Sequence, residues 1–199
     1  MAASMQGHRT RTASIEVTDS LVDAALALLE ESGIASLTVR AVASRAGVAP
    51  MGVYSRFGSK DGLLEALFVH GFTGLESAIE PQPSPSPMNR LRTGCMGYRE
   101  FAINNPQMYH LMFEQMMLLE LSPEAQDAAK RTFMLLVDRV QETMNSGDLA
   151  AGNSVEVAQQ LWSAMHGAVS LEIAGVHFAQ DREANYAALL EAMFNGLSA

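Results

Sequence analysis

Cysteine, long apolar runs and alternating apolar patterns are scarce or missing in this sequence of 199 residues. The single cysteine, Cys95, cannot form a disulfide within the chain, which favours a reducing compartment. No stretch approaches the roughly 18 consecutive apolar residues that a membrane-spanning helix needs. The N-terminus also lacks the apolar segment of a secretory signal. We therefore expect a cytoplasmic protein that does not enter a membrane.

The period-two alternation that is typical of β-strands is also missing. Hydrophobic residues make up 48% of the chain, which excludes a disordered protein. After residue 87 the pattern predicts helices over the ranges 88–104, 106–120, 123–146, 154–178 and 182–197. With the helices of the N-terminal part, this makes an all-α fold of about nine helices.

Motifs for metal binding and catalysis are absent as well. The sequence contains no C-x-x-C, H-E-x-x-H, G-x-S-x-G or phosphate-binding loop. On a single helix, His166 and His177 would be roughly 16 Å apart, too far to share one metal ion. We expect neither a metal site, nor a cofactor, nor a catalytic site.

Acidic residues are missing from residues 36–60, which carry four basic side chains although the formal net charge of the protein is −9. Residues 1–60 hold six basic against five acidic side chains, and residues 61–199 hold seven against seventeen. A basic segment of this kind can lie on phosphates, while the acidic remainder is repelled from DNA and orients the molecule.

Two short helices can be predicted within this basic segment. Thr38 suits an N-cap, and Val39, Val42, Ala43 and Ala46 follow it at helical spacing. Gly47 suits the end of this helix, and Pro50 suits the first turn of the next. Two short helices joined by a glycine turn, with a basic outer face, form a helix-turn-helix.

Helical angles indicate which side chains the second helix presents outward. Met51 and Ser55 lie opposite the inward-pointing Val53, Gly52 and Tyr54 flank them, and Arg56 lies nearer the edge. This face lacks the Asn, Gln or central Arg that usually makes bidentate contacts with bases. Sequence preference would therefore rest on thymine methyl contacts from Met51, on the Ser55 hydroxyl and on DNA shape.

Residues 37–60, LTVRAVASRAGVAPMGVYSRFGSK, followed by DGLLEALF, resemble the DNA-binding motif of the TetR family of transcriptional regulators. The resemblance covers about residues 15–75, and beyond them it concerns only the helical organisation. One departure is Ala49, where the family usually has a Ser or Thr cap, so we expect a less firmly started second helix. The resemblance implies a homodimer on double-stranded operator DNA, usually a repressor, that a small-molecule inducer releases.

On this interpretation the chain divides into three parts. Residues 1–14 would be a flexible arm, residues 15–75 a three-helix DNA-binding domain with its motif at 38–57, and residues 76–199 a helical bundle for ligand binding and dimerisation. The proline-rich run PQPSPSP at 81–87 would be a stiff connector. The expected phosphate contacts are Thr38, Arg40, Tyr54, Arg56 and Lys60. The expected base contacts are Pro50, Met51, Gly52 and Ser55.

The bundle is rich in methionine and aromatic residues, which line adaptable apolar pockets. Eight of the thirteen methionines fall within residues 88–146. The same residues can equally be ordinary helical core. The predicted ligand-binding residues are Tyr98, Phe101, Tyr109, Met112, Phe113, Met116, Phe133 and His166.

The segment 161–176, LWSAMHGAVSLEIAGV, is rich in small residues that let another helix approach closely. Its W-x-x-x-H-G pattern resembles the penultimate helix of many TetR relatives. With residues 182–197 it would build a two-fold four-helix interface. The predicted dimer residues are Trp162, Ala164, Gly167, Ala168, Leu171, Gly175, Leu189, Leu190 and Met193.

Two other functions remain open. One is a constitutive regulator or activator that binds DNA without an inducer, and it would not respond to any small molecule. The other is an all-α enzyme or carrier with a vestigial helix-turn-helix, and it would show no DNA affinity at low salt.

Overall fold

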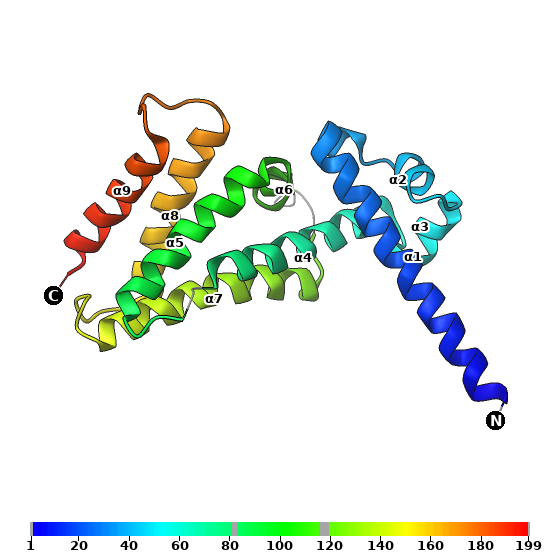
Figure 1. Cartoon of the computed structure of the whole chain (residues 1–199), viewed down its shortest axis with the longest axis horizontal. Coiled ribbons are helices and arrows are strands. Elements are labelled where there is room, and N and C mark those ends of the chain that lie inside the picture. Colours follow the sequence, from blue (N-terminus) through cyan, green and yellow to red (C-terminus); the bar gives the residue numbers. More distant parts are fainter. Residues whose placement is uncertain (1, 81–82, 116–119, 199) are drawn as a thin grey trace. The chain divides into compact units, whose positions relative to one another are not determined.

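The computed structural model describes residues 2–80, 83–115 and 120–198 (Figure 1). Within these ranges it contains nine α-helices and no strand, which confirms the predicted all-α fold. The chain forms two compact units. The first unit is Met1–His70 with Gln107–Ala125, and the second is Gly71–Pro106 with Gln126–Ala199. Residues 107–125 thus belong with the N-terminal unit, which the contiguous domains drawn from the sequence did not include.

The helix-turn-helix lies in the first unit at the predicted position. In α2 (Val39–Arg45), the third backbone N–H donates to Thr38 Oγ at 3.1 Å, so Thr38 is the N-cap. Gly47 ends this helix with φ of +68°, a left-handed conformation that favours glycine. Ala49 supplies no side-chain cap to α3 (Pro50–Phe57), as expected from that alanine. The core-facing side chains of both helices are fully buried: Val42, Ala43 and Val53.

Helix α1 (Ala2–Ser32) begins within the stretch expected to be a flexible arm. Residues 2–14 lack an apolar period and contain no proline. Without proline the backbone can be helical there, so the missing apolar period did not exclude a helix. Further along, Leu21, Ala25 and Leu29 are buried.

Helix α4 (Lys60–Ile79) belongs to both units. Its first turn is capped by Ser59, whose Oγ accepts a hydrogen bond from the Gly62 N–H at 3.0 Å. A Cβ added at Gly62 would lie 2.0 Å from the Phe57 carbonyl oxygen, so only glycine fits where α3 turns into α4. Four apolar side chains of its first half are buried: Leu63, Leu64, Leu67 and Phe68.

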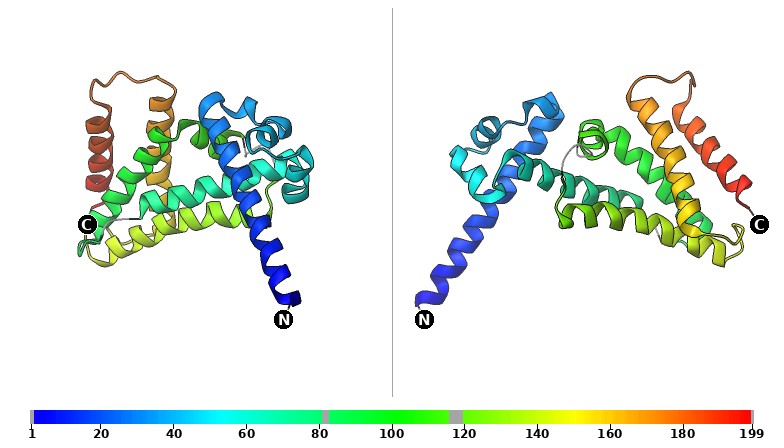
Figure 2. Two further views of the ribbon diagram at one scale, coloured as in Figure 1. Left: turned by 45° about the vertical axis from the view of Figure 1, so that its right-hand side comes forward. Right: turned by 180° about the vertical axis from the view of Figure 1, so that it is seen from behind.

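In the second unit, α5 (Pro87–Asn104) lies against both α8 (Ser154–Ile173) and α9 (Arg182–Gly196). Helix α7 (Pro123–Asn145) runs alongside α4, and Thr132 of α7 donates to Glu76 at 3.2 Å (Figures 1 and 2). Glycine again permits the closest approach. A Cβ at Gly97 of α5 would lie 2.1 Å from the Ala78 carbonyl oxygen at the end of α4.

Three arginines of α5 bind carboxylates on three other helices. Arg90 pairs with Glu142 of α7 at 3.1 Å, and Arg92 pairs with Glu191 of α9 at 2.6 Å. Arg99 binds Glu172 of α8 through two hydrogen bonds of 2.8 and 2.9 Å. The hydrogen bonds from these arginines lower the pKa values of Glu142 and Glu191. Helix α5 is therefore the centre of the second unit.

Two predicted helices differ from the structure. The predicted helix 106–120 is a short α6 (Pro106–His110) followed by a π-helical turn, Leu111–Gln115. The helix predicted to reach residue 178 ends at Ile173. Gly175 follows with φ of +71°, and the Val176 N–H donates to the Leu171 carbonyl at 2.9 Å, a Schellman stop. Apolar residues beyond that glycine extended the pattern but not the helix.

Candidate nucleic-acid interface

The outward face of α3 is formed by Met51, Tyr54 and Ser55. Met51 is 72% exposed and Tyr54 48% exposed, whereas Val53 on the opposite side is fully buried. Ser55 and Pro50 are exposed beside them. This orientation agrees with the face that helical angles predict. An exposed methionine one turn before a hydroxyl, with an exposed tyrosine next to that hydroxyl, can offer apolar contact and hydrogen bonding to the same surface.

Ser55 and Arg56 are hydrogen-bonded to their own helix. Ser55 Oγ donates to the Gly52 carbonyl at 3.0 Å. Arg56 Nη1 donates to the same carbonyl at 3.2 Å and to Ser55 Oγ at 3.1 Å. Arg56 Nε is buried and finds no hydrogen-bond partner in the described ranges. The half-buried guanidinium is thus folded along α3, which a sequence pattern alone does not indicate.

Gly52 supplies the carbonyl that receives these bonds. A Cβ there would meet Val48 at 3.5 Å and Arg56 Nη1 at 3.9 Å, which are ordinary contacts. Its backbone lies outside the region of positive φ. Glycine at this position is therefore not required by the fold.

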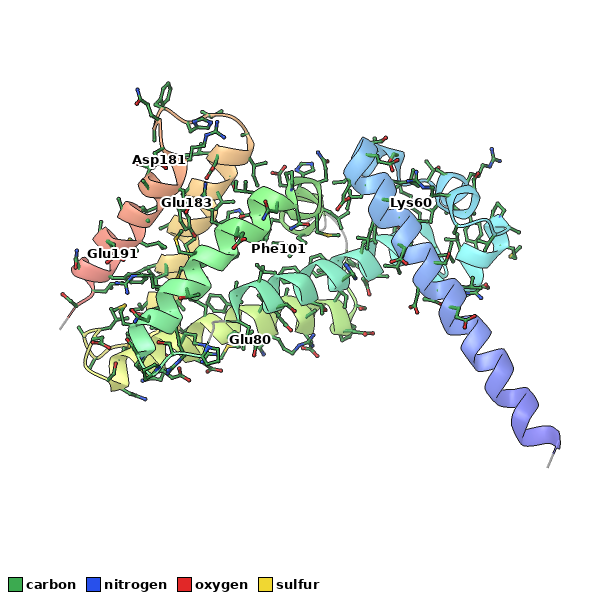
Figure 3. The ribbon with its side chains drawn as sticks, in the orientation of Figure 1. Lys60, Glu80, Phe101, Asp181, Glu183 and Glu191 are labelled. Carbon is green, nitrogen blue, oxygen red and sulfur yellow. The ribbon has the colours of Figure 1, made fainter. Side chains whose placement is uncertain are left out.

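The cations of the segment differ in their availability to a phosphate. Arg40 and Lys60 are exposed, and Lys60 opens α4 (Figure 3). Arg45 instead donates to both carboxylate oxygens of Glu31 on α1, which lowers the pKa of Glu31. Thr38 is exposed, and its oxygen caps α2 while its hydrogen remains able to donate. The positive charges that face outward are therefore at the starts of α2 and α4.

Some of the predicted ligand-binding residues lie in aromatic clusters, one cluster in each unit. In the second unit, Trp162 Nε1 donates to Tyr98 Oη at 3.3 Å, and Tyr98 Oη also contacts His166 Nδ1 at 3.2 Å. The Phe133 ring packs edge-on against Trp162 with centroids 6.0 Å apart. A phenol, an indole and an imidazole joined in this way are polar anchors among aromatic rings.

The other predicted ligand residues make different contacts. Phe101 (labelled in Figure 3) is half-buried against Gly74. Tyr109, Met112 and Phe113 belong to the first unit, where the rings of Tyr109 and Phe113 lie 4.7 Å apart. Met116 lies outside the described residues.

The predicted dimer residues differ in how exposed their side chains are. Gly167, Leu171 and Gly175 are exposed, and Leu171 is 54% exposed. Ala164, Ala168, Leu189 and Met193 are half-buried. Leu190 is 1% exposed and belongs to the core of its own unit, while Trp162 is engaged with Tyr98.

The pattern missed two exposed apolar side chains next to this face. Phe178 is 99% exposed and Val176 55% exposed, in the loop between α8 and α9. Their signal in the sequence was an apolar run continuing past Gly175, which was assigned to the helix instead. Among the described residues no helix is long and apolar enough to cross a membrane. In the same ranges no group of three or more His, Cys, Asp or Glu side chains could hold a metal ion.

A short helix pair with an outward face and flanking cations defines a regulator of the helix-turn-helix class. Residues 21–67 match the family described as bacterial regulatory proteins, tetR family. Residues 91–195 match the family described as tetracyclin repressor-like, C-terminal domain. The chain belongs to the TetR family of transcriptional regulators.

Solved structures share this fold over nearly the whole chain. A protein of unknown function from a Rhodococcus species superposes with a TM-score of 0.83 at 23% identity, covering 92% of this chain and 96% of that one. The TetR family regulator PfmR from Thermus thermophilus superposes with a TM-score of 0.68 at 18% identity, covering 90% and 99%.

Among curated proteins, the HTH-type transcriptional regulator BetI of Burkholderia thailandensis is 39% identical over 75 residues. The BetI of Burkholderia cenocepacia shows the same identity over the same length. The match spans 36% of this chain and only 38% of the Burkholderia thailandensis protein. The likeness to BetI is therefore confined to a stretch far shorter than either protein.

Proposed function

We propose that this TetR family regulator is a cytoplasmic repressor that binds a palindromic operator as a homodimer and is released by a small apolar or aromatic ligand. The observation that carries the DNA-binding part is the outward face of α3 flanked by the exposed cations Arg40 and Lys60. Both cations stand in residues 36–60, which hold no acidic side chain, although Asp61 directly follows Lys60. Positive charge facing a phosphate is therefore least opposed at Arg40.

In this proposal Thr38, Arg40, Tyr54 and Lys60 contact phosphates and set the orientation of the protein on the duplex. Pro50, Met51, Gly52 and Ser55 meet the base edges. The hydrogen bonds that hold Arg56 Nη1 on α3 favour a supporting role for Arg56 over the phosphate contact expected from sequence.

The proposed dimer uses α8, α9 and the loop that joins them. A Cβ at Gly167 would meet nothing within 4 Å, and Leu171 of the same helix and Phe178 of the following loop are exposed. Exposed apolar side chains on and after a helix with small outward residues favour a second helix pair as the partner. A two-fold pair would place two α3 helices on half-sites one helical turn apart, or a multiple of it.

The proposed ligand site is built around the Tyr98–Trp162–His166 cluster of the second unit. An aromatic or apolar molecule could pack against Phe133 and Trp162 while a polar group replaces one bond of the cluster. The ligand would favour an arrangement of the bundle that binds operator poorly.

The DNA-binding proposal is tested by measuring affinity for a DNA sequence that the full-length protein has selected from a random pool. Lys60→Ala should weaken binding to all sequences alike and make the slope of log affinity against log salt shallower by about one. Met51→Ala should change which bases are preferred, reducing the free-energy difference between the preferred and other bases by about 1–3 kcal/mol, without changing the salt slope. A Lys60→Ala protein with altered base preference and an unaltered slope would contradict these roles. A constitutive regulator would show the same DNA binding but no release by any ligand.

A further inference from the structure

The Ser55 hydroxyl has a defined hydrogen-bonding polarity. A hydroxyl has one hydrogen to donate and two lone pairs to accept with. The Ser55 hydrogen is used by the Gly52 carbonyl at 3.0 Å, and one lone pair accepts from Arg56 Nη1 at 3.1 Å. The group that remains on the exposed face of α3 is a lone pair, so Ser55 meets a partner from outside as an acceptor.

Arg56 maintains this polarity. Its Nη1 donates both to Ser55 Oγ and to the Gly52 carbonyl. An oxygen that already accepts from a guanidinium cannot direct its own hydrogen toward that group. The hydroxyl hydrogen therefore stays on the Gly52 carbonyl, because turning it outward would give up that bond.

In the major groove, the hydrogen-bond donors of the bases are the N6 amino group of adenine and the N4 amino group of cytosine. Guanine presents N7 and O6, and thymine presents O4 and a methyl group; none of these donates. We propose that Ser55 recognises operator DNA by accepting a hydrogen bond from an exocyclic amino group of adenine or cytosine, with Arg56 as the residue that positions its hydroxyl. This inference rests on the proposed operator binding through α3 and specifies what α3 reads.

Arg56 itself is the alternative reader. If its guanidinium left α3 on binding and donated to guanine, the Ser55 hydroxyl would be free to donate as well. The contact at this position would then be to the acceptors of guanine or thymine. Every base pair offers both an amino donor and acceptors in the major groove, so the two arrangements are separated by removing single groups from the bases.

The experiment uses the full chain and its best duplex selected from random DNA. Each adenine of a half-site is replaced in turn by purine deoxyriboside, which lacks the N6 amino group. Each cytosine is replaced by the 2-pyrimidinone deoxyriboside, which lacks the N4 amino group. At one position the wild type should lose affinity by about threefold to tenfold, the range of one net hydrogen bond. Ser55→Ala should bind the substituted and natural duplexes alike there, which also corrects for weakened base pairing.

Two further variants test the polarity. Ser55→Thr keeps the oxygen and should keep the loss on amino-group removal. Arg56→Met keeps the length of the side chain without its donors, and it should reduce that discrimination while leaving the salt slope unchanged. A slope shallower by about one would instead assign Arg56 to a phosphate and remove its positioning role.

The inference is overturned if no amino-group removal affects the wild type, or if Ser55→Ala still discriminates at the same position. It is also overturned if removing an acceptor, as in 7-deazaguanine, rather than an amino group reproduces the affinity that Ser55→Ala loses. A wild-type protein that binds none of the selected DNA at low salt is a different result, because it refutes the proposed operator binding itself. Lys60→Ala serves as the matched control, since it should change the salt slope but not the response to amino-group removal.

Discussion

Gly62 and Gly97 lie where the backbone of one helix passes very close to the backbone of another. A Cβ at Gly62 would lie 2.0 Å from a carbonyl oxygen at the end of α3, and one at Gly97 would lie 2.1 Å from a carbonyl oxygen of α4. A backbone oxygen cannot rotate away as a flexible side chain can. The two glycines therefore determine how closely α4 approaches the elements before and after it in the chain.

Gly97→Ala should destabilise the protein by about 1–3 kcal/mol, the usual cost of forcing an extra carbon into a packed site. The matched control is Gly196→Ala at the end of α9, where an added Cβ meets nothing within 4 Å. Urea unfolding followed by circular dichroism measures both variants. Equal stability of the two would show that α4 and α5 separate at no cost.

The hydrogen bonds of Arg56 show what a sequence pattern cannot supply for a site. Helical angles placed Met51 and Ser55 outward, because the angle depends only on the position along the helix. Whether Arg56 extends to solvent or folds onto Gly52 depends on the rotamer and on the bare carbonyl beside it. The outer face could therefore be predicted, and its hydrogen-bonding polarity could not.

Among helices, the pairing of α5 with α8 depends on a largely buried ion pair. The side chains of Arg99 and Glu172 are only 13% and 9% exposed, and two hydrogen bonds join them. The hydrogen bonds that Arg99 donates to Glu172 raise the pKa of Arg99, which stays charged at all working pH values. Arg99 also lies over the ring of Tyr186, with 5.9 Å from its guanidinium carbon to the ring centroid, which ties α9 to the same pair.

Arg99→Met should destabilise the second unit by about 3–5 kcal/mol, because it leaves the Glu172 carboxylate buried without its partner. The double variant Arg99→Met with Glu172→Gln should recover much of that loss, since no uncompensated charge remains. Thermal unfolding of the single and double variants provides the comparison. A double variant no more stable than the single one would mean that packing by the arginine, rather than charge, holds the helices.

The ends of a helix could be predicted where a residue at the end itself favours a start or a stop. Thr38, Pro50 and Ser59 mark helix starts through their own side chains, and all three helices begin where these residues indicate. The break of the predicted helix 106–120 after His110 has no such mark, because a π-helical turn follows from packing rather than from a local residue. Gly175 is a residue that often ends a helix, but the apolar residues after it continue the helical pattern, so the stop was not predicted.

Dimerisation of the whole protein can be tested by a substitution on the exposed face of α8. Gly167→Phe should yield monomers, because a phenyl ring on this face would separate the two helix pairs. The substitution fits the single chain, where a Cβ at Gly167 meets nothing within 4 Å, so folding is preserved. Gly167→Ala is the control and should stay dimeric. Sedimentation that finds an unaltered Gly167→Phe dimer would exclude α8 from the interface.

Ligand and operator should be coupled through the chain that the two units share. Helix α4 begins at Lys60, a proposed phosphate contact, and ends beside Gly97 of α5 in the second unit. A ligand that favours a bundle arrangement with a displaced α4 would change the DNA affinity. Because coupling is reciprocal, operator DNA must weaken the ligand by the same factor, typically about 5–150-fold.

Calorimetric titration of an active inducer, with and without operator, measures this factor directly. We expect a lower ligand affinity in the presence of operator, and a constitutive regulator predicts a ratio of one. Tyr98→Phe removes the oxygen that both Trp162 and His166 contact, so it should weaken the ligand by several-fold, or about 0.5–1.5 kcal/mol, while operator affinity stays unchanged. Equal ligand affinities in both titrations would exclude the coupling. A Tyr98→Phe protein with normal ligand affinity would place the ligand elsewhere, because a site anchored on that phenol must respond to the loss of its oxygen.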